Sequence, residues 1–292
     1  MKQNKTVAST IFDVFNHIFL GIWAIITVLP FLYVLAASFA SDSEIKTRTF
    51  FIIPHNPTLL TYKFIFASNY FLRSMLNSVI ITVGGTLVNL FFTFTMAYAL
   101  SKKHFIGRSI ILNGVIFTML FGGGMIPTYL LVKSLGLLDS YWALWLPGAI
   151  SPFNFFVVKN FFQEMPQDLE DAARIDGCTE AQVLWKIILP LSKPIIATFA
   201  LFYGVGHWNS WFGALLYIND AEKWPVQLIL RQIVMLSTTL ASDLTQFDPN
   251  FQPPQESLKM AIIVVATLPI MLLYPWLQKY FIKGMFIGSL KE

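Results

Sequence analysis

The sequence contains long apolar runs without a charged side chain, and residues 18–39 form the first of them. A helix needs about 20 apolar residues to cross a bilayer, so this run is long enough to span. Backbone groups inside lipid must be paired within the protein, which favours helices over irregular chain. Such runs occur at residues 18–39, 75–100, 110–132, 141–158, 195–218 and 260–277. We therefore expect an all-α polytopic membrane protein with six transmembrane helices.

The composition indicates the same class. Of 292 residues, 55% are hydrophobic and 12% are charged, whereas soluble proteins are about 25% charged. The single cysteine, Cys178, excludes an intrachain disulfide framework and a cysteine metal cluster. The net charge of +4 lies beside the apolar runs, so we interpret it as a topology signal and expect no nucleic-acid partner. We expect one transmembrane domain over residues 1–292, with membrane lipid around it.

Two of the runs leave alternatives open. Residues 18–39 end near Ser38-Phe39-Ala40, which resembles a signal-peptide cleavage site. Signal-peptide cores are usually about 7–15 residues long, so the greater length of this run, and Pro30 within it, favour a retained helix. The third run is interrupted by residues 122–124, which are all glycine, and by Pro127. That interruption fits a gate facing a cavity, or a helix that ends early and continues as an interfacial segment.

Catalytic and metal-binding patterns are absent from the sequence. It has no Walker loop, no Gly-x-Ser-x-Gly and no His-Glu-x-x-His. The histidines, His17, His55, His104 and His207, are too scattered to suggest a metal site. Only His207 is a titratable group well inside a run, and we favour a hydrogen-bonded packing role over a functional one. We expect neither an enzyme nor a chain that binds a cofactor or metal itself.

A polar stretch at residues 159–193 separates the fourth and fifth apolar runs. It predicts two short helices joined at Gly177, which can adopt the left-handed conformation that closes a helix. Thr179 and Gln182 have the spacing of a capping box that opens the second helix. Pro190 is expected to end or kink that helix. On the first helix, i, i+3 and i+4 spacing places Leu169, Ala172 and Ala173 close together. The small alanines would let another surface approach closely, so the stretch has the character of a docking element.

The same stretch resembles the EAA motif of ABC-importer permeases. Asp171-Ala172-Ala173 stands where that motif has Glu-Ala-Ala, and Gly177, Ile187 and Leu189-Pro190 follow at the motif's spacing. A cytosolic loop of some other membrane protein is the alternative. The resemblance implies docking to an ABC ATPase through Leu169, Glu170, Asp171, Ala172, Ala173, Asp176, Gly177, Ile187, Leu189 and Pro190.

The resemblance implies a role for several of these residues. Ala172 and Ala173 would enter the ATPase cleft, with Asp171 holding the contact by charge. Gly177 would supply the bend. Leu169 would pack the hairpin against the membrane core together with Ile187.

Further segments resemble, more narrowly, the sugar-importer permeases of maltose-transporter type, in particular the second permease of Gram-positive oligosaccharide systems. The matching segments are residues 59–62, 77–78, 126–127, 153–156, 208–209 and 281–291. The resemblance implies a MetI-like core that pairs with a second homologous permease, above ABC ATPase subunits that hydrolyse ATP. It also implies an extracytoplasmic sugar-binding protein, and import of sugars, specifically oligosaccharides, by alternating access.

Two regions carry candidate substrate contacts. Residues 219–258 are expected to form a long extracytoplasmic loop. The resemblance implies that residues 219–255 enter the cleft of the binding protein and help to expel the sugar, while a passive connection is the alternative. Phe153, Trp208, Asn209 and Trp211 are candidates for pore or sugar contact. Aromatic rings also anchor membrane interfaces, which is the competing interpretation. The sugar itself stays open, because a neutral oligosaccharide, an acidic pectin fragment or another glycoconjugate would all fit.

The basic residues predict the orientation. With both termini in the cytoplasm, most of the 20 Lys and Arg residues lie inside. The short loop at residues 102–108 is strongly basic, and short loops are where the positive-inside rule counts most. The polar stretch at residues 159–193 then faces the cytoplasm, where an ATPase would be. We expect a bacterial cytoplasmic membrane protein.

Two other classes of protein fit the sequence less well. An ion-coupled secondary transporter usually carries intramembrane acids or bases, and the six runs contain no Asp, Glu, Lys or Arg. An intramembrane enzyme or scaffold is disfavoured because no nucleophile–base pair is evident. An ATP-driven importer subunit is therefore the preferred hypothesis.

Overall fold

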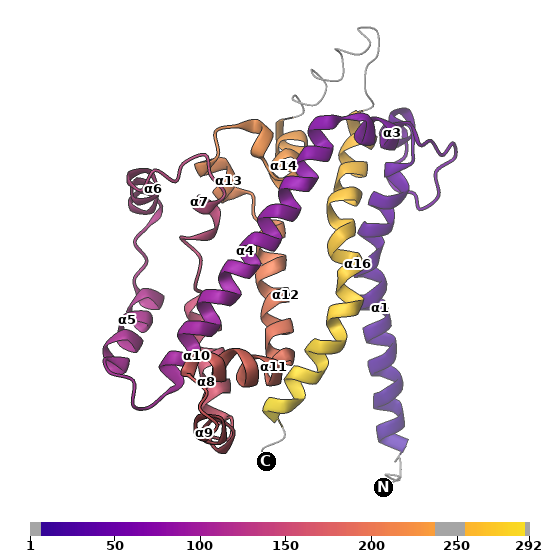
Figure 1. The fold of residues 1–292 in the computed structure, drawn as a ribbon. Coiled ribbons are helices and arrows are strands. Elements are labelled where there is room, and N and C mark those ends of the chain that lie inside the picture. The colour runs from indigo at the N-terminus through magenta and orange to yellow at the C-terminus, as the bar shows by residue number, and fades with distance from the viewer. Residues whose placement is uncertain (1–6, 237–254, 290–292) are drawn as a thin grey trace. The chain divides into compact units, whose positions relative to one another are not determined.

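The computed structural model describes residues 7–236 and 255–289, and every regular element within those ranges is a helix. Figure 1 shows the arrangement of these helices along the chain. The chain divides into two compact units. The first comprises Met1–Asn69 with Gln232–Thr267, and the second comprises Tyr70–Arg231 with Leu268–Glu292.

The first unit contains α1 (Val7–Ser38), α2 (Asp42–Thr47), α3 (Leu60–Ala67) and the first half of α16 (Gln255–Ser289). Large apolar side chains of α1 are exposed along its length, as expected of a helix in lipid. Its C-terminal end packs with Phe51 in a small core. The carboxylate of Asp42 accepts hydrogen bonds from the backbone N–H groups of Glu256 and Ser257 at 3.3 and 3.0 Å, and so caps the start of α16.

The second unit is organised along α4 (Asn69–Ser101), a helix of 33 residues. Its membrane part continues through α5 (Arg108–Leu120), α6 (Met125–Ser134), α7 (Trp142–Trp145) and α8 (Pro152–Glu164). A hairpin of α9 (Asp168–Ile175), α10 (Glu180–Val183), the π-helix η1 (Leu184–Ile188) and α11 (Leu189–Leu191) follows. The unit continues with α12 (Lys193–Asn209), α13 (Phe212–Tyr217), the 3₁₀-helix η2 (Ala221–Lys223) and α14 (Val226–Leu236).

Three helices in the described part of the chain are long and apolar enough to span a membrane: Ser9–Ser38, Asn69–Ser101 and Gln255–Leu273. A bent pair, Glu180–Leu191 with Lys193–Asn209, would make a fourth if it counts as one span. The six-helix count therefore stays a prediction. Three of the expected runs are broken, because residues 121–124 interrupt the third, residues 146–151 the fourth and residues 210–211 the fifth. At the first break, Gly124 has a φ of +86°, which only glycine adopts easily.

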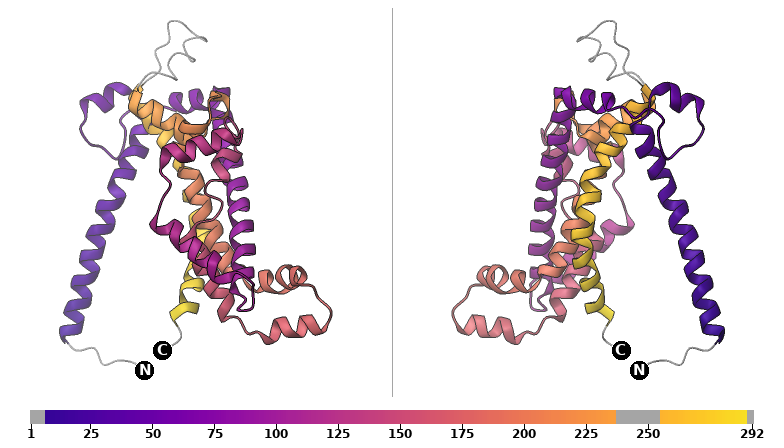
Figure 2. Two further views of the ribbon diagram at one scale, coloured as in Figure 1. Left: turned by 90° about the vertical axis from the view of Figure 1, so that its left-hand side faces the viewer. Right: turned by 90° about the vertical axis from the view of Figure 1, so that its right-hand side faces the viewer.

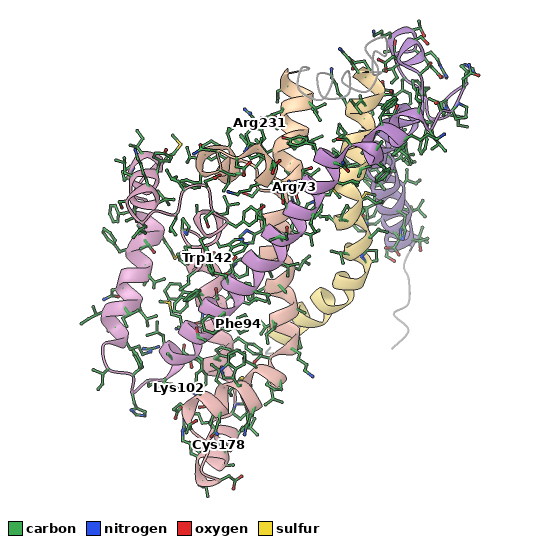
Figure 3. All side chains as sticks on the ribbon, turned by 45° about the horizontal axis from the view of Figure 1, so that its top comes forward. Arg73, Phe94, Lys102, Trp142, Cys178 and Arg231 are labelled. Atoms are coloured by element: carbon green, nitrogen blue, oxygen red, sulfur yellow. The ribbon has the colours of Figure 1, made fainter. Side chains whose placement is uncertain are left out.

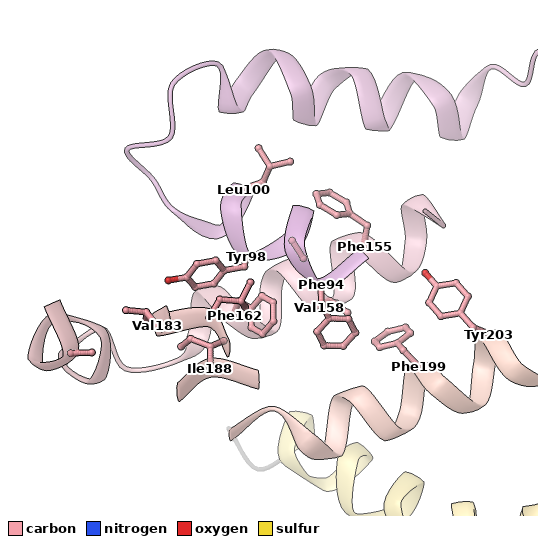
Figure 4. Close-up of a cluster of buried hydrophobic side chains, with 13 residues drawn as sticks. Phe94, Tyr98, Leu100, Phe155, Val158, Phe162, Val183, Ile188, Phe199 and Tyr203 are labelled. Atoms are coloured by element: carbon pink, nitrogen blue, oxygen red, sulfur yellow. The ribbon is translucent and has the colours of Figure 1, made fainter. Parts of the chain in front are cut away.

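A buried apolar cluster joins the hairpin to the membrane helices (Figure 4). Phe94 of α4 and Phe162 of α8 meet edge to face with ring centroids 5.9 Å apart. Val183 and Ile188 of the hairpin are buried in the same cluster. Because the cluster is continuous, the hairpin is packed onto α4 and α8 rather than suspended as a loose loop.

Candidate functional site

The first helix of the hairpin closes as the sequence predicts. Gly177 has a φ of +81° and follows the C-cap residue Asp176. The N–H of Gly177 donates to the carbonyl of Arg174 at 3.0 Å, and that of Cys178 donates to Ala173 at 2.9 Å. These two bonds form a Schellman motif with glycine at its left-handed position.

The second helix also begins and bends as predicted. Thr179 accepts from the N–H of Gln182, and the Gln182 side chain accepts from the N–H of Thr179 at 2.8 Å, which completes the capping box. Five residues before α11 are π-helical. Pro190 in α11 has no N–H to donate, and the chain turns by 84° between Leu191 and Lys193. Figure 2 shows the far end of the hairpin projecting beyond the other helices of its unit.

Burial divides the expected docking residues into two groups. Leu169, Asp171, Ala172, Asp176, Gly177 and Pro190 are exposed, whereas Glu170, Ala173, Ile187 and Leu189 are buried or partly buried. Ala173 is 5% exposed and packs within the core cluster, so it does not stand open to a cleft as expected. Leu169 is 43% exposed and does not pack the hairpin against the core, although Ile187 does.

The open face of α9 includes a residue that the sequence reasoning missed. Ile175 is 87% exposed. It lies three residues after Ala172 and six after Leu169, so the three side chains form a stripe that follows an oblique i±3n row across the exposed face of the helix. That spacing was visible in the sequence and could have identified Ile175. Asp168, Asp171 and Asp176 flank the stripe with exposed carboxylates.

Arg174 organises the charges of the hairpin. Its guanidinium donates to Asp171 at 2.7 Å, to Glu180 at 2.8 Å and to Glu170 at 3.1 Å. The hydrogen bond to Glu180 is the main cause that raises the pKa of Arg174 above its ordinary value. The same bond lowers the pKa of Glu180. These contacts tie α9 to α10 across the Gly177 turn.

The four candidate pore residues are placed differently from one another. Trp208 is 6% exposed and lines an apolar cavity of about 450 Å³ between α4, α12 and α16. Trp211 is half-buried, with the guanidinium of Arg231 4.4 Å from its ring centroid. Phe153 on α8 is 64% exposed, and Asn209 is exposed at the end of α12. The structure brings Trp208, Asn209 and Trp211 to one end of α12, while Phe153 belongs to another helix.

His207 takes part in a polar joint inside the second unit. Its Nε2 donates to Oδ1 of Asn89 at 2.6 Å. The amide of Asn89 donates in turn to the carbonyls of Gly148 at 2.6 Å and Ala149 at 3.0 Å. These carbonyls belong to the break in the fourth run, where helical partners are missing, and unpaired backbone groups are costly at membrane depth. The contacts of His207 are therefore those of a hydrogen-bonded packing residue.

Among residues 7–236 and 255–289, no group of three or more His, Cys, Asp or Glu side chains is placed to hold a metal ion. The described residues thus form an exposed contact surface on α9. They also form the hydrogen-bonded group in which His207 and Asn89 hold the backbone at Gly148 and Ala149.

Residues 91–287 match the family described as "binding-protein-dependent transport system inner membrane component". The chain belongs to this family. It is therefore a permease subunit of an ABC importer in the cytoplasmic membrane, and the predicted family and fold class are confirmed. The match covers the hairpin and most of the second unit.

Individual relatives cover nearly the whole chain. Protein LplC of Bacillus subtilis (strain 168) is 59% identical over 289 residues, which is 99% of this chain and 98% of that protein. The polygalacturonan/rhamnogalacturonan transport system permease protein YtcP of the same organism is 50% identical over 281 residues, covering 96% and 98%. Among solved structures, a bacterial ABC transporter involved in the import of the acidic polysaccharide alginate matches with a TM-score of 0.89. It is 31% identical and covers 96% of this chain and 100% of that chain.

Proposed function

We propose that this permease imports acidic oligosaccharides, such as fragments of a polyuronate. The observation that carries the proposal is the 50% identity to a polygalacturonan/rhamnogalacturonan permease along nearly the full chain. The likeness to an alginate importer supports the same substrate class. Permeases named for arabinooligosaccharides and galactooligosaccharides match at 27–32% identity.

A basic group on the proposed outer side is consistent with an acidic substrate. The side chain of Arg231 forms no ion pair with any residue in the described ranges, and its guanidinium lies over Trp211. A guanidinium presents a planar set of donors that matches a carboxylate. The aromatic ring holds that guanidinium in place, and the sugar acid would meet it at the outer end of α12 and α14.

The exposed face of α9 is proposed to bind an ABC ATPase subunit, which hydrolyses the ATP. Its apolar stripe of Leu169, Ala172 and Ile175 is bordered by acidic side chains. Such a surface fits an apolar groove with a basic rim, because charge complementarity orients the partner while burial of the apolar stripe stabilises the complex.

The remaining partners complete the transport cycle. A second homologous permease would form the other half of the pathway, and a solute-binding protein would deliver sugar from outside. ATP binding would draw the docking hairpins together, so that the two permeases rock and the cavity changes its open side. Both termini would be cytoplasmic, which the basic loop at residues 102–108 supports. The described part of the outer loop contains η2 and α14, while residues 237–254 lie outside the described residues.

The test is uptake of labelled oligogalacturonate by cells that depend on this chain, with unlabelled competitors. Energy-dependent uptake that is blocked by oligogalacturonate, and not by a neutral galactooligosaccharide, is the expected result. Equal competition by the neutral sugar would contradict the acidic substrate class. Uptake that persists after ATP depletion would contradict ATP-driven import.

A further inference from the structure

The C-terminal end of α4 is held by side chains from several neighbouring elements. Arg108 of α5 donates from Nε to the carbonyl of Leu100 at 2.9 Å. Gln163 of α8 donates to the carbonyl of Ser101 at 3.3 Å. The last carbonyls of a helix have no partner within the helix, so these contacts fix the end of α4 in place.

The docking hairpin attaches to this end through buried charge. Lys102, directly after α4, forms an ion pair with Glu170 of α9, and Arg174 bonds the same carboxylate at 3.1 Å. Glu170 is 5% exposed, and the ammonium of Lys102 also lies 4.3 Å from the ring centroid of Tyr98. Removing one partner from a buried ion pair is costly because it leaves an uncompensated charge. The carboxylate is therefore fixed between its two cations.

A second contact holds the other helix of the hairpin. The hydroxyl of Tyr98 donates to Oε2 of Glu180 at 3.0 Å. Both helices of the hairpin thus bind the last turn of α4 or the residue directly after it. Figure 3 shows Lys102 and Cys178 at this end of α4, with Arg73 toward the other end.

The opposite part of α4 is bonded in the same manner to the segment before α14. The amide of Asn77 donates to the carbonyls of Glu222 at 2.7 Å and Trp224 at 3.1 Å. Ser78 accepts from the N–H of Val226 at 2.8 Å. An α-helix rises about 1.5 Å per residue, so roughly 30–38 Å separate these contacts from the hairpin. One continuous helix connects them.

We propose that Lys102, Glu170 and Arg174 form an ionic joint that fixes the docking hairpin to α4, so that α4 carries the hairpin's movement to the segment at residues 219–226. These three are positioning residues. The proposal rests on the proposed function, because it takes the open face of α9 as the ATPase contact. It assigns different tasks to two adjacent acids, since Asp171 faces outward to the partner and Glu170 faces inward to the joint.

The test compares single substitutions in the full transport complex reconstituted in liposomes. Lys102→Met removes the ammonium while Glu170 keeps Arg174. Lys103→Met is the matched control, because Lys103 is the next residue and is exposed. The measured quantity is sugar imported per ATP hydrolysed, which loss of folded complex alone would leave unchanged. Lys102→Met is expected to lower this ratio by about 2- to 30-fold, the range seen when one member of a coupling network is removed.

Further variants complete the test. Lys102→Arg keeps the charge and should restore the ratio, whereas Lys103→Met should match the wild type. If the Lys102→Met complex cannot be recovered, Lys102→Gln decides, because it removes the same positive charge and keeps an amide group near Glu170. A normal ratio in the recovered Lys102→Met complex, or in Lys102→Gln when that variant decides, would overturn the joint and leave the proposed function standing. Import by the wild-type complex without ATP would instead overturn the proposed function.

Discussion

Gly85 of α4 lies directly against the ring of His207. A Cβ atom added at Gly85 would be 2.5 Å from both Cε1 and Nε2 of that ring, well inside the contact distance of about 3.5–4.0 Å. The ring cannot move freely, because its Nε2 is bonded to Asn89 at 2.6 Å. Gly85→Ala must therefore displace His207 and weaken the joint that satisfies the broken fourth run.

The size of the effect follows from opposing contributions. Overpacking a filled site costs about 1–3 kcal/mol, and a lost hydrogen bond costs about 1 kcal/mol. Alanine in place of glycine within a helix returns roughly 0.5–1 kcal/mol. We expect the free energy of unfolding to fall by about 1–3 kcal/mol, the difference between these contributions.

The assay is the thermal midpoint of the purified chain in detergent. At about 2–4 °C per kcal/mol, Gly85→Ala should lower the midpoint by roughly 2–12 °C. Gly114→Ala on α5 is the control, because a Cβ there meets nothing within 4 Å, and its midpoint should be unchanged or higher. Equal midpoints for the two variants would refute the close approach of α4 and α12. Combined with His207→Ala, the cost should be less than the sum of the two, since both changes act on one contact.

Three further predictions concern the hairpin and the outer side. Gly177→Val places a β-branched residue at a φ of +81°, which costs roughly 1–2 kcal/mol. Sugar uptake should fall although an immunoblot shows a normal amount of the chain in the membrane, and full uptake would contradict the need for the turn. Ile175→Asp should abolish co-purification of the ATPase. Ile106 is 94% exposed in the neighbouring loop, and Ile106→Asp should leave co-purification intact. An equal effect of both substitutions would argue against the apolar stripe as the ATPase contact. Arg231→Met should slow uptake of the acidic oligosaccharide about tenfold, as expected for a lost charged hydrogen bond. Lys63 is exposed, and Lys63→Met should leave uptake unchanged. Equal uptake rates in these two variants would contradict a role of Arg231 in recognition.

Features set by neighbouring residues were predictable from the sequence. The Schellman turn at Gly177, the capping box at Thr179 and Gln182, and the bend near Pro190 depend on local backbone chemistry. The long apolar runs likewise indicated membrane helices. The motif at Asp171 identified the family because several residues matched at fixed spacing.

Features set by distant residues were not predictable. The sequence does not distinguish Glu170 from Asp171, because the burial of Glu170 depends on Lys102, which lies 68 residues earlier in the chain. The break in the fourth run is stabilised by Asn89, which lies 59 residues before Gly148. The hydropathy of residues 141–158 predicts one continuous span. The tertiary hydrogen bonds that stabilise the break have no signature in the local sequence. The burial of Ala173 likewise depends on packing against distant parts of the chain.

The most direct test of the account is affinity purification of this chain from its native membrane in mild detergent, followed by mass spectrometry of the proteins that accompany it. The account predicts recovery of a second permease and an ABC ATPase, with the ATPase lost from Ile175→Asp and retained by Ile106→Asp. Recovery of the chain alone, still able to move sugar into liposomes without ATP, would contradict it.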